Sequence, residues 1–285
     1  MLTAGDVQFE PPQSKIAPIT NSIVAMLAGD SSLQSEIMSH VLPYVVNKIK
    51  DNKNLGRWLE VREIAYVYRD YFNFIKNLKA ENDILSPLFL DRQSFSAQQK
   101  NMSPDLIKQI ATELINFKMP QIATIIAGVD ENGPHLYTIE DGKVNCLDGV
   151  GFVSIGSGSW HANSQLMFVG HCKQHPFAET LLLTFSAKKR AEVAPGVGSE
   201  TDMFTVGPRL GSLTDISPEH IAKLKEIYED THNQEKSILN NAKQRASQYV
   251  QEIIDATSSI SEQTTIPEND LRNTPAHGET ISDEK

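Results

Sequence analysis

The feature of this sequence that most constrains its fold is a glycine–serine turn between strand-like and helix-like segments. The run Ile155-Gly156-Ser157-Gly158-Ser159 predicts the end of a strand, followed by a turn that opens a helix. Two further strand-like runs, 121–129 and 135–139, precede it, and the turn-forming residues 130–133 separate them. We therefore expect a sheet whose third strand in this region, 150–155, passes into a helix at the turn.

The first hundred or so residues predict a hairpin followed by helices. The apolar runs 14–19 and 23–28 flank a three-residue turn, and helical spacing follows from Ser31, with Pro43 inside the pattern. Ser31 and Gln34 have the spacing of a capping box. Further helices are predicted at about 59–78 and 104–117, with Pro104 at the first helical position. Between them, 79–102 breaks the pattern and is interpreted as an insertion or a mobile connection.

The rest of the chain is predicted to be mainly helical. Helices are expected at about 160–171 and 176–193, a strand at 201–206, and a long helix or helix pair at 217–256. From 257 to 285 the chain is polar, and we expect a disordered tail because it cannot bury enough apolar surface. This order of strands and helices predicts a mixed α/β or α+β fold.

Charge and cysteine content exclude several classes of protein. The chain has 285 residues and a formal net charge of −10, and no basic stripe with interleaved aromatic residues, which argues against a nucleic-acid partner. Two cysteines, Cys146 and Cys172, are too few for a disulfide framework and fit a reducing compartment. No secretory leader is recognisable after Met1, and the apolar run 23–28 is too short to cross a membrane. We expect a soluble cytoplasmic protein without a membrane partner.

Five short motifs follow one another along the chain, and the first three are evenly spaced. They are Thr3-Ala4-Gly5, Ser14-Lys15-Ile16, Leu27-Ala28-Gly29-Asp30, Gly156-Ser157-Gly158, and Glu192 before Pro195-Gly196. Thr3 lies twelve residues before Lys15, and Lys15 lies twelve residues before Leu27. This order and spacing resemble the proteasome β-subunit family of N-terminal-nucleophile (Ntn) hydrolases over roughly residues 1–206. The resemblance implies an α+β fold of four layers, an αββα sandwich, over 1–210, with 211–256 as a helical extension.

The resemblance also implies threonine-type peptide hydrolysis, in which the first residue of the chain supplies the nucleophile and its free amine acts as the base. Lys15 would then be the lysine that keeps this amine neutral by like-charge repulsion. Gly29 would supply a backbone N–H to the oxyanion. Ser157 and Glu192 would complete the hydrogen bonds around the amine.

Four residues are implied to bind substrate. Thr3 and Ser31 would hold the substrate backbone as an added strand. Leu2 and Leu27 would line an apolar first specificity pocket. The resemblance implies a homo-oligomer in a ring or helical assembly, a peptide or unfolded protein as substrate, and an ATP-driven unfoldase as a candidate partner.

No cofactor and no metal are expected. His171, Cys172 and His175 lie close together in the sequence, but a structural zinc site needs four ligands, and only three candidates cluster here. We therefore interpret these side chains as solvent-exposed residues of a turn between two helices.

The sequence departs from the family at its beginning and at one helix end. Members carry the nucleophile, and the carboxylate that orients the lysine, before the Thr-x-Gly segment, whereas only Met1 and Leu2 precede Thr3. Glu192 stands where aspartate is usual, and Pro195 where serine is usual. We expect the nucleophile to lie upstream of Met1. The alternatives are an inactive ring or scaffold subunit that lacks the nucleophile, and an amidase of another kind on the same fold.

Overall fold

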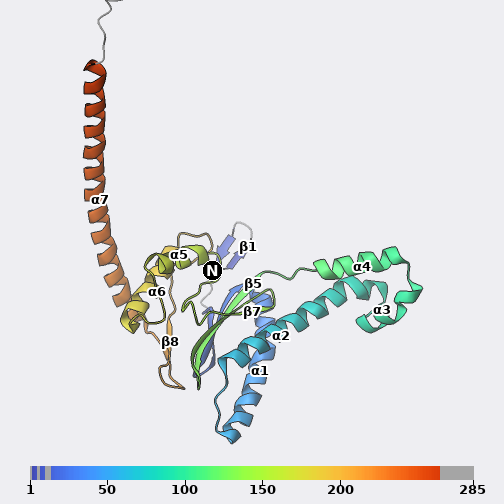
Figure 1. Ribbon diagram of the computed structural model, residues 1–285. Coiled ribbons are helices and arrows are strands. Elements are labelled where there is room, and N and C mark those ends of the chain that lie inside the picture. Colours follow the sequence, from blue (N-terminus) through green and yellow to red (C-terminus); the bar gives the residue numbers. More distant parts are fainter. Residues whose placement is uncertain (1, 5–6, 10–13, 264–285) are drawn as a thin grey trace, which may run out of the picture. The chain divides into compact units, whose positions relative to one another are not determined.

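The computed structural model describes residues 2–4, 7–9 and 14–263, and it divides the chain into two compact units, Met1–Tyr228 and Glu229–Lys285 (Figure 1). The first unit is built on a five-stranded antiparallel sheet in the order β3-β4-β5-β6-β7. Its strands are β3 (Ile16–Thr20), β4 (Ile23–Gly29), β5 (Ile122–Asp130), β6 (Gly133–Glu140) and β7 (Lys143–Cys146). Both predicted hairpins, β3–β4 and β5–β6, are confirmed.

The predicted strand at 150–155 is wrong. The N–H groups of Val150 and Gly151 both donate to the carbonyl of Leu147, at 3.0 Å and 2.9 Å, and close a tight turn. This turn takes the chain away from the edge of the sheet, and Phe152 packs against helices rather than beside a strand. The strand at this edge is instead β7, which pairs with β6 and was not predicted.

One face of the sheet is covered by α1 (Ser31–Leu55) and α2 (Val61–Ala80). Apolar residues at four-residue spacing along α1 turn one side of the helix towards the sheet, as predicted, and Ile37, Val41 and Val45 are buried there. From α2, Tyr68 and Phe72 complete this core, which is the largest in the molecule's described part.

The capping box predicted at the start of α1 is wrong, because Asp30 caps the helix. Its Oδ1 accepts the N–H of Leu33 at 2.8 Å, and its carbonyl accepts the N–H of Gln34 at 3.1 Å. The side chain of Gln34 is therefore not needed at the helix end and turns into the core, where it is 3% exposed.

Residues 79–102, predicted as an insertion or mobile connection, are largely helical. A π-helix (Glu81–Leu85) and a 3₁₀ turn (Ser86–Leu88) follow α2 directly, then come α3 (Arg92–Gln98) and a second 3₁₀ turn (Gln99–Asn101). The predicted helix start at Ser103 is confirmed by α4 (Pro104–Asn116), whose first turn the Ser103 hydroxyl caps. A small separate core holds these helices together, formed by Leu85, Phe95 and Ile110.

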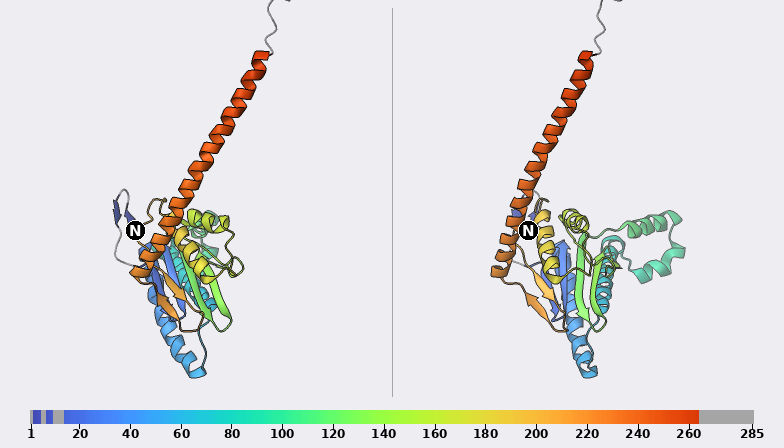
Figure 2. Two further views of the ribbon diagram at one scale, coloured as in Figure 1. Left: turned by 90° about the vertical axis from the view of Figure 1, so that its left-hand side faces the viewer. Right: turned by 60° about the vertical axis from the view of Figure 1, so that its left-hand side comes forward.

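The other side of the sheet carries a second helix pair, α5 (Ser159–Phe168) and α6 (Phe177–Ala191), both close to their predicted positions (Figure 2). Two short antiparallel ribbons stand apart from the central sheet: β1 (Leu2–Ala4) with β2 (Val7–Phe9), and β8 (Phe204–Val206) with β9 (Leu213–Asp215). The predicted strand at 201–206 is thus confirmed only for its second half. The fold is a mixed helix-and-sheet, α+β architecture.

The long C-terminal helix is confirmed as α7 (Pro218–Gln263). It continues past 256, so residues 257–263 are helical rather than part of a tail, and residues 264–285 lie outside the described residues. Among the helices that the structure describes, none combines the length and apolar character needed to cross a bilayer.

Candidate functional site

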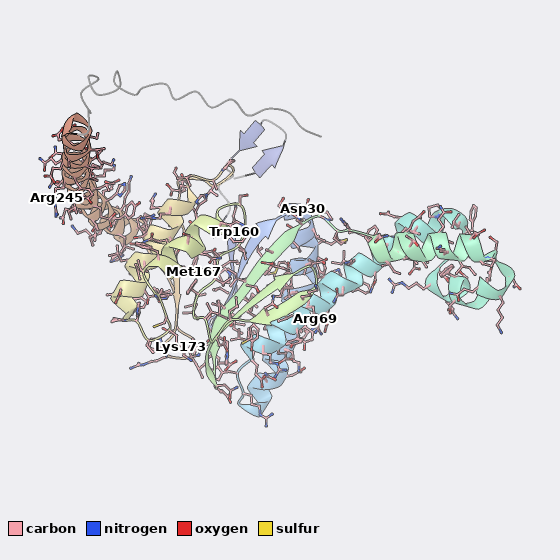
Figure 3. The ribbon with its side chains drawn as sticks, turned by 45° about the horizontal axis from the view of Figure 1, so that its top comes forward. Asp30, Arg69, Trp160, Met167, Lys173 and Arg245 are labelled. Carbon is pink, nitrogen blue, oxygen red and sulfur yellow. The ribbon has the colours of Figure 1, made fainter. Side chains whose placement is uncertain are left out.

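The end of β4 and the glycine–serine turn meet in the structure, although more than a hundred residues separate them in sequence. A methyl group added at Gly156 would lie 3.3 Å from the Cβ of Ala28, which is closer than ordinary van der Waals contact. Gly156 has a φ of +84° and starts a turn in which its carbonyl accepts the N–H of Ser159 at 3.1 Å. Figure 3 labels Asp30 and Trp160, which follow these two segments. Two of the predicted catalytic motifs are therefore neighbours.

Gly29 occupies a position that only glycine fits. Its φ is +95°, and a Cβ there would lie 2.1 Å from the carbonyl oxygen of Gln121 on the chain entering β5. The next residue, Asp30, donates its N–H to the same Gln121 carbonyl at 3.1 Å. This close approach fixes the backbone at the junction of β4 and α1, where the sequence predicted an oxyanion donor.

The glycine–serine turn also touches the end of α6. Gly158 precedes α5, and a Cβ on it would lie 2.7 Å from the Cβ of Ala191 and 3.1 Å from Cγ2 of Val197. Because Glu192 follows Ala191 directly, the motif that contains Glu192 also begins next to the turn. Ser157 itself is exposed at the tip of the turn.

Glu192 is bound by lysines of its own helix. Its Oε1 accepts hydrogen bonds from Lys188 and, at 2.8 Å, from Lys189. The same lysines donate to the carbonyls of Gly198 at 3.0 Å and Ser199 at 3.4 Å, which fixes the glycine-rich loop after the helix. Burial raises the pKa of Glu192, but the two lysine hydrogen bonds outweigh burial and hold this pKa below its usual value. The carboxylate thus stays charged, bound to the two lysines.

Lys15 lies directly before β3, next to the end of β4. Its carbonyl accepts the N–H of Leu27 at 2.9 Å, which places the two residues opposite each other across the hairpin. Its side chain is exposed, and within the described part of the chain no carboxylate forms an ion pair with it. Lys15 therefore lies two strand positions from Gly29 with its ammonium group in solvent.

The predicted substrate-binding residues divide into two pairs. Leu27 is half-buried against the core beneath α1, and Ser31 is exposed in the first turn of that helix. Both therefore lie beside Gly29. Leu2 and Thr3 belong to β1, where Thr3 pairs with Gln8, but their side chains lie outside what the structure describes.

A buried polar network supports the end of β4. Its only sign in the sequence is a polar residue at an apolar position of the helix pattern. Gln34 Nε2 donates to the carbonyl of Ala28 at 3.1 Å and to Thr124 Oγ1 at 3.1 Å. Tyr68 donates its hydroxyl to Gln34 Oε1 and accepts from Thr124 at 2.9 Å. Burial raises the pKa of Tyr68 to about 12. The network ties α1, α2 and β5 together directly under the site.

His135 belongs to a separate cluster that joins strands. Its Nδ1 lies 2.7 Å from Asp148 Oδ2, and its Nε2 lies 3.3 Å from Asp130 Oδ1. Burial lowers the pKa of His135, but both carboxylates raise it, and the net shift is upward. The same carboxylates accept the backbone N–H groups of Leu136 and Val61, so this cluster holds β6 against its neighbours.

His171 and His175 do meet in the turn between α5 and α6, with their Nδ1 atoms 3.3 Å apart. The predicted solvent exposure is wrong for His171, which is buried because its ring packs beside that of Phe152. Burial and the neighbouring imidazole lower the pKa of His171. Over the described residues no group of three or more histidine, cysteine or acidic side chains is arranged to hold a metal ion.

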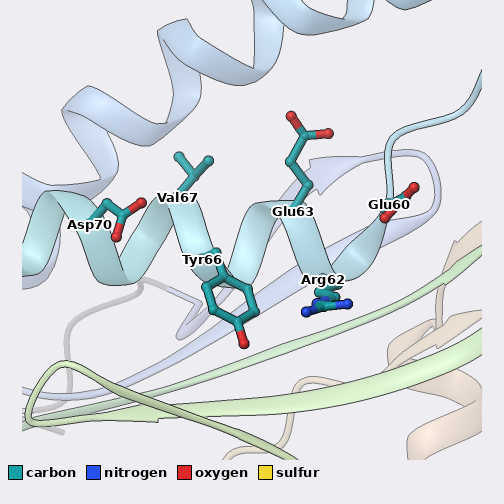
Figure 4. Close-up of a pocket in the computed structure, with 6 residues that line it drawn as sticks. All are labelled: Glu60, Arg62, Glu63, Tyr66, Val67 and Asp70. Atoms are coloured by element: carbon teal, nitrogen blue, oxygen red, sulfur yellow. The ribbon is translucent and has the colours of Figure 1, made fainter.

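A shallow depression on α2 offers no alternative site (Figure 4). Its lining comes from one helix and the residue before it: Glu60, Arg62, Glu63, Tyr66, Val67 and Asp70. Glu63 already accepts a hydrogen bond from Tyr44 at 2.8 Å and pairs with Lys48 at 3.1 Å. The guanidinium of Arg69 lies over the ring of Tyr66, 4.5 Å from its centre. Two of the acidic groups in its lining are thus already paired, Glu63 with Lys48 and Asp70 with Arg69.

Comparison with known proteins adds no relative: no protein-family model matches the chain, and no curated protein matches it.

Proposed function

We propose that this chain is a proteasome-β-like subunit of an Ntn hydrolase that cleaves peptide bonds, with the nucleophile on residues upstream of Met1. One observation carries the proposal. Ala28 at the end of β4 lies next to Gly156 of the glycine–serine turn, and Gly158 of this turn lies next to Ala191 at the end of α6. Lys15 lies opposite Leu27 across the β3–β4 hairpin. These segments come from distant parts of the sequence and are the ones that the family motifs single out.

Each of these segments carries a group whose chemistry suits a role in peptide hydrolysis. The ammonium of Lys15 favours a neutral amine on the nucleophilic residue and stabilises negative charge in the transition state. The backbone N–H at Gly29 donates to the oxyanion, on a backbone that Gln121 keeps rigid. The hydroxyl of Ser157 and the charged carboxylate of Glu192 hydrogen-bond around the amine. Leu27 and Ser31 receive the substrate beside the nucleophile.

The proposal includes the four-layer αββα sandwich. Support comes from the sheet face that turns away from α1 and α2, where Val24 and Ile125 are 1% and 4% exposed although they lie outside the helix-side core. Both faces of the sheet are therefore covered. The second sheet would contain β8 and β9, with α5 and α6 as the outer layer.

The proposal also covers the assembly, the location and the partner of the protein. A homo-oligomeric ring or helical assembly in the cytoplasm would enclose the sites, and an ATP-driven unfoldase would deliver unfolded protein to them.

The test is a hydrolysis assay with fluorogenic peptides, using protein isolated from the native source and a Lys15→Ala variant made in the same host. We expect hydrolysis by the unmodified protein and a loss of kcat of about 100-fold or more in the variant, because removing one group that stabilises transition-state charge costs roughly 10²–10³-fold. Lys143→Ala on β7, also an exposed lysine, is the matched control and should keep full activity.

Two other outcomes would overturn the proposal in different ways. Hydrolysis of small amides but of no peptide in the panel would make the protein an amidase of another kind. An assembled, folded protein that cleaves neither class would be a scaffold subunit.

A further inference from the structure

The second half of α7 carries an exposed apolar stripe. Ile238, Leu239, Tyr249, Val250 and Ile253 are each between 48% and 68% exposed. From Glu229 to Gln263, the part of this unit that the structure describes, α7 is the only element. Helices draw most of their stability from packing of an apolar face, so a stripe of this length calls for a partner surface.

The stripe has the spacing of a coiled coil. Its central line alternates steps of three and four residues and consists of Leu239, Ala242, Ala246, Tyr249, Ile253 and Ala256. This alternation is the a/d pattern of a heptad repeat, in which each residue fits between four residues of a facing helix. Opposite the stripe the helix is polar, with Asn240, Gln244 and Gln251. The partner surface that fits this stripe is therefore another helix.

The six residues of this central line form the seam of the predicted coiled coil. Their sizes favour one direction for the facing helix. In a parallel pair in register, large residues would face large ones, such as Tyr249 on Tyr249, and alanine would face alanine. In an antiparallel pair, Leu239 faces Ala256, Ile253 faces Ala242 and Tyr249 faces Ala246 of the other copy. Every layer then combines a large and a small side chain, which is the arrangement that fills a helix interface evenly.

Charge selects the same direction. Arg245, which Figure 3 labels, and Glu252 lie seven residues apart on one edge of the seam. The part of the chain that the structure describes supplies an ion-pair partner to neither. In the antiparallel register above, Arg245 of each copy lies beside Glu252 of the other, which gives two ion pairs. In a parallel pair the residue across from Arg245 is Val250, which offers no charge.

We propose that residues 238–256 of α7 pair antiparallel with the same segment of a second copy of this chain. In this pairing each large side chain of the segment meets a small one of the other copy, and each Arg245 meets Glu252 of the other copy. This pairing does not depend on the hydrolase activity proposed above, and it would hold equally in a scaffold protein.

Disulfide trapping in the full chain tests the pairing. Leu239→Cys and Ala256→Cys are introduced together, with Cys146→Ser and Cys172→Ser removing the native thiols. Within one helix the two positions are 17 residues, or about 26 Å, apart, so they cannot bridge internally. We expect mild oxidation to give dimers linked from 239 to 256, and neither single cysteine variant to link. Links from 239 to 239, or no links at all, would overturn the proposal.

A charge exchange in the same background tests the register. Arg245→Glu places like charges together twice and should lower the equilibrium constant for pairing by about tenfold, read from the yield of 239–256 links. Adding Glu252→Arg restores both ion pairs and should restore the yield. Gln244→Glu on the polar face is the control and should leave it unchanged. A double variant that stays as weak as Arg245→Glu alone would contradict the antiparallel register.

Discussion

Gly29 is the residue on which the geometry of the candidate site most depends. Gly29→Ala must adopt a positive φ and must also move the Gln121 carbonyl, which would lie 2.1 Å from the new Cβ. Gly133→Ala shares a positive φ but meets nothing within 4 Å. The conformational cost is about 1–3 kcal/mol for each. We expect Gly29→Ala to lose at least about 2 kcal/mol more than Gly133→Ala, because overpacking adds its own cost.

Urea denaturation of the two variants measures this difference. Equal losses of unfolding free energy would mean that the backbone at Gly29 has room to move, and that the β4–α1 junction is not rigid.

Glu192 gives the site a dependence on pH. Since its folded-state pKa lies below the unfolded value, its stabilisation is present above the unfolded pKa, about 4.3, and is lost as the pH falls through the folded pKa. Glu192→Gln should cost about 1 kcal/mol at pH 7 and progressively less below pH 4. Stability measured from pH 7 to pH 3 checks this. Glu140→Gln, at an exposed carboxylate on β6, should show no such convergence.

At the scale of elements, Gly158 sets how closely the glycine–serine turn approaches α6. Gly158→Ala keeps an accessible φ of −87° but drives its Cβ to 2.7 Å from Ala191. We expect a loss of about 1–3 kcal/mol, together with displacement of the turn. Gly149→Ala, where a Cβ meets nothing within 4 Å, should be nearly neutral. Thermal unfolding compares the two, and a neutral Gly158→Ala would show that the turn and the helix are not in firm contact.

Local sequence patterns sufficed to predict most helices and strands, but not which segment forms the edge strand of the sheet. The two hairpins and all the named α-helices except α3 follow from turn residues and apolar spacing, which act within a few residues. The strand predicted at 150–155 has suitable residues, yet the turn at Leu147 denies it a neighbour, while β7 exists only because β6 lies beside it. Strand pairing is a tertiary property, so a single apolar run does not determine it.

The candidate site shows the same limit. Lys15, Leu27 and Gly29 were predictable together because one hairpin carries them. The approach of Ala28 to the turn at Gly156 depends on tertiary packing, which patterns within a few residues do not determine. The buried role of Gln34 was not predictable at all, since a capping box and a core hydrogen bond have the same sequence signature.

At the scale of the whole molecule, different parts of the chain have different proposed functions. The unit Met1–Tyr228 holds the surface proposed for hydrolysis, and α7 carries the seam proposed to join two copies. The two proposals can fail separately, because disulfide trapping reads only α7 and peptide hydrolysis reads only the site.

The most direct measurement of the central claim locates the nucleophile chemically. Protein from the native source is treated with a peptide that carries an electrophilic carbonyl group, and the modified residue is identified by mass spectrometry. The account predicts one adduct, on a threonine or serine that begins the mature chain upstream of Met1, and its loss in Lys15→Ala. An adduct on Ser157, or an intact folded protein without any adduct, would contradict the account.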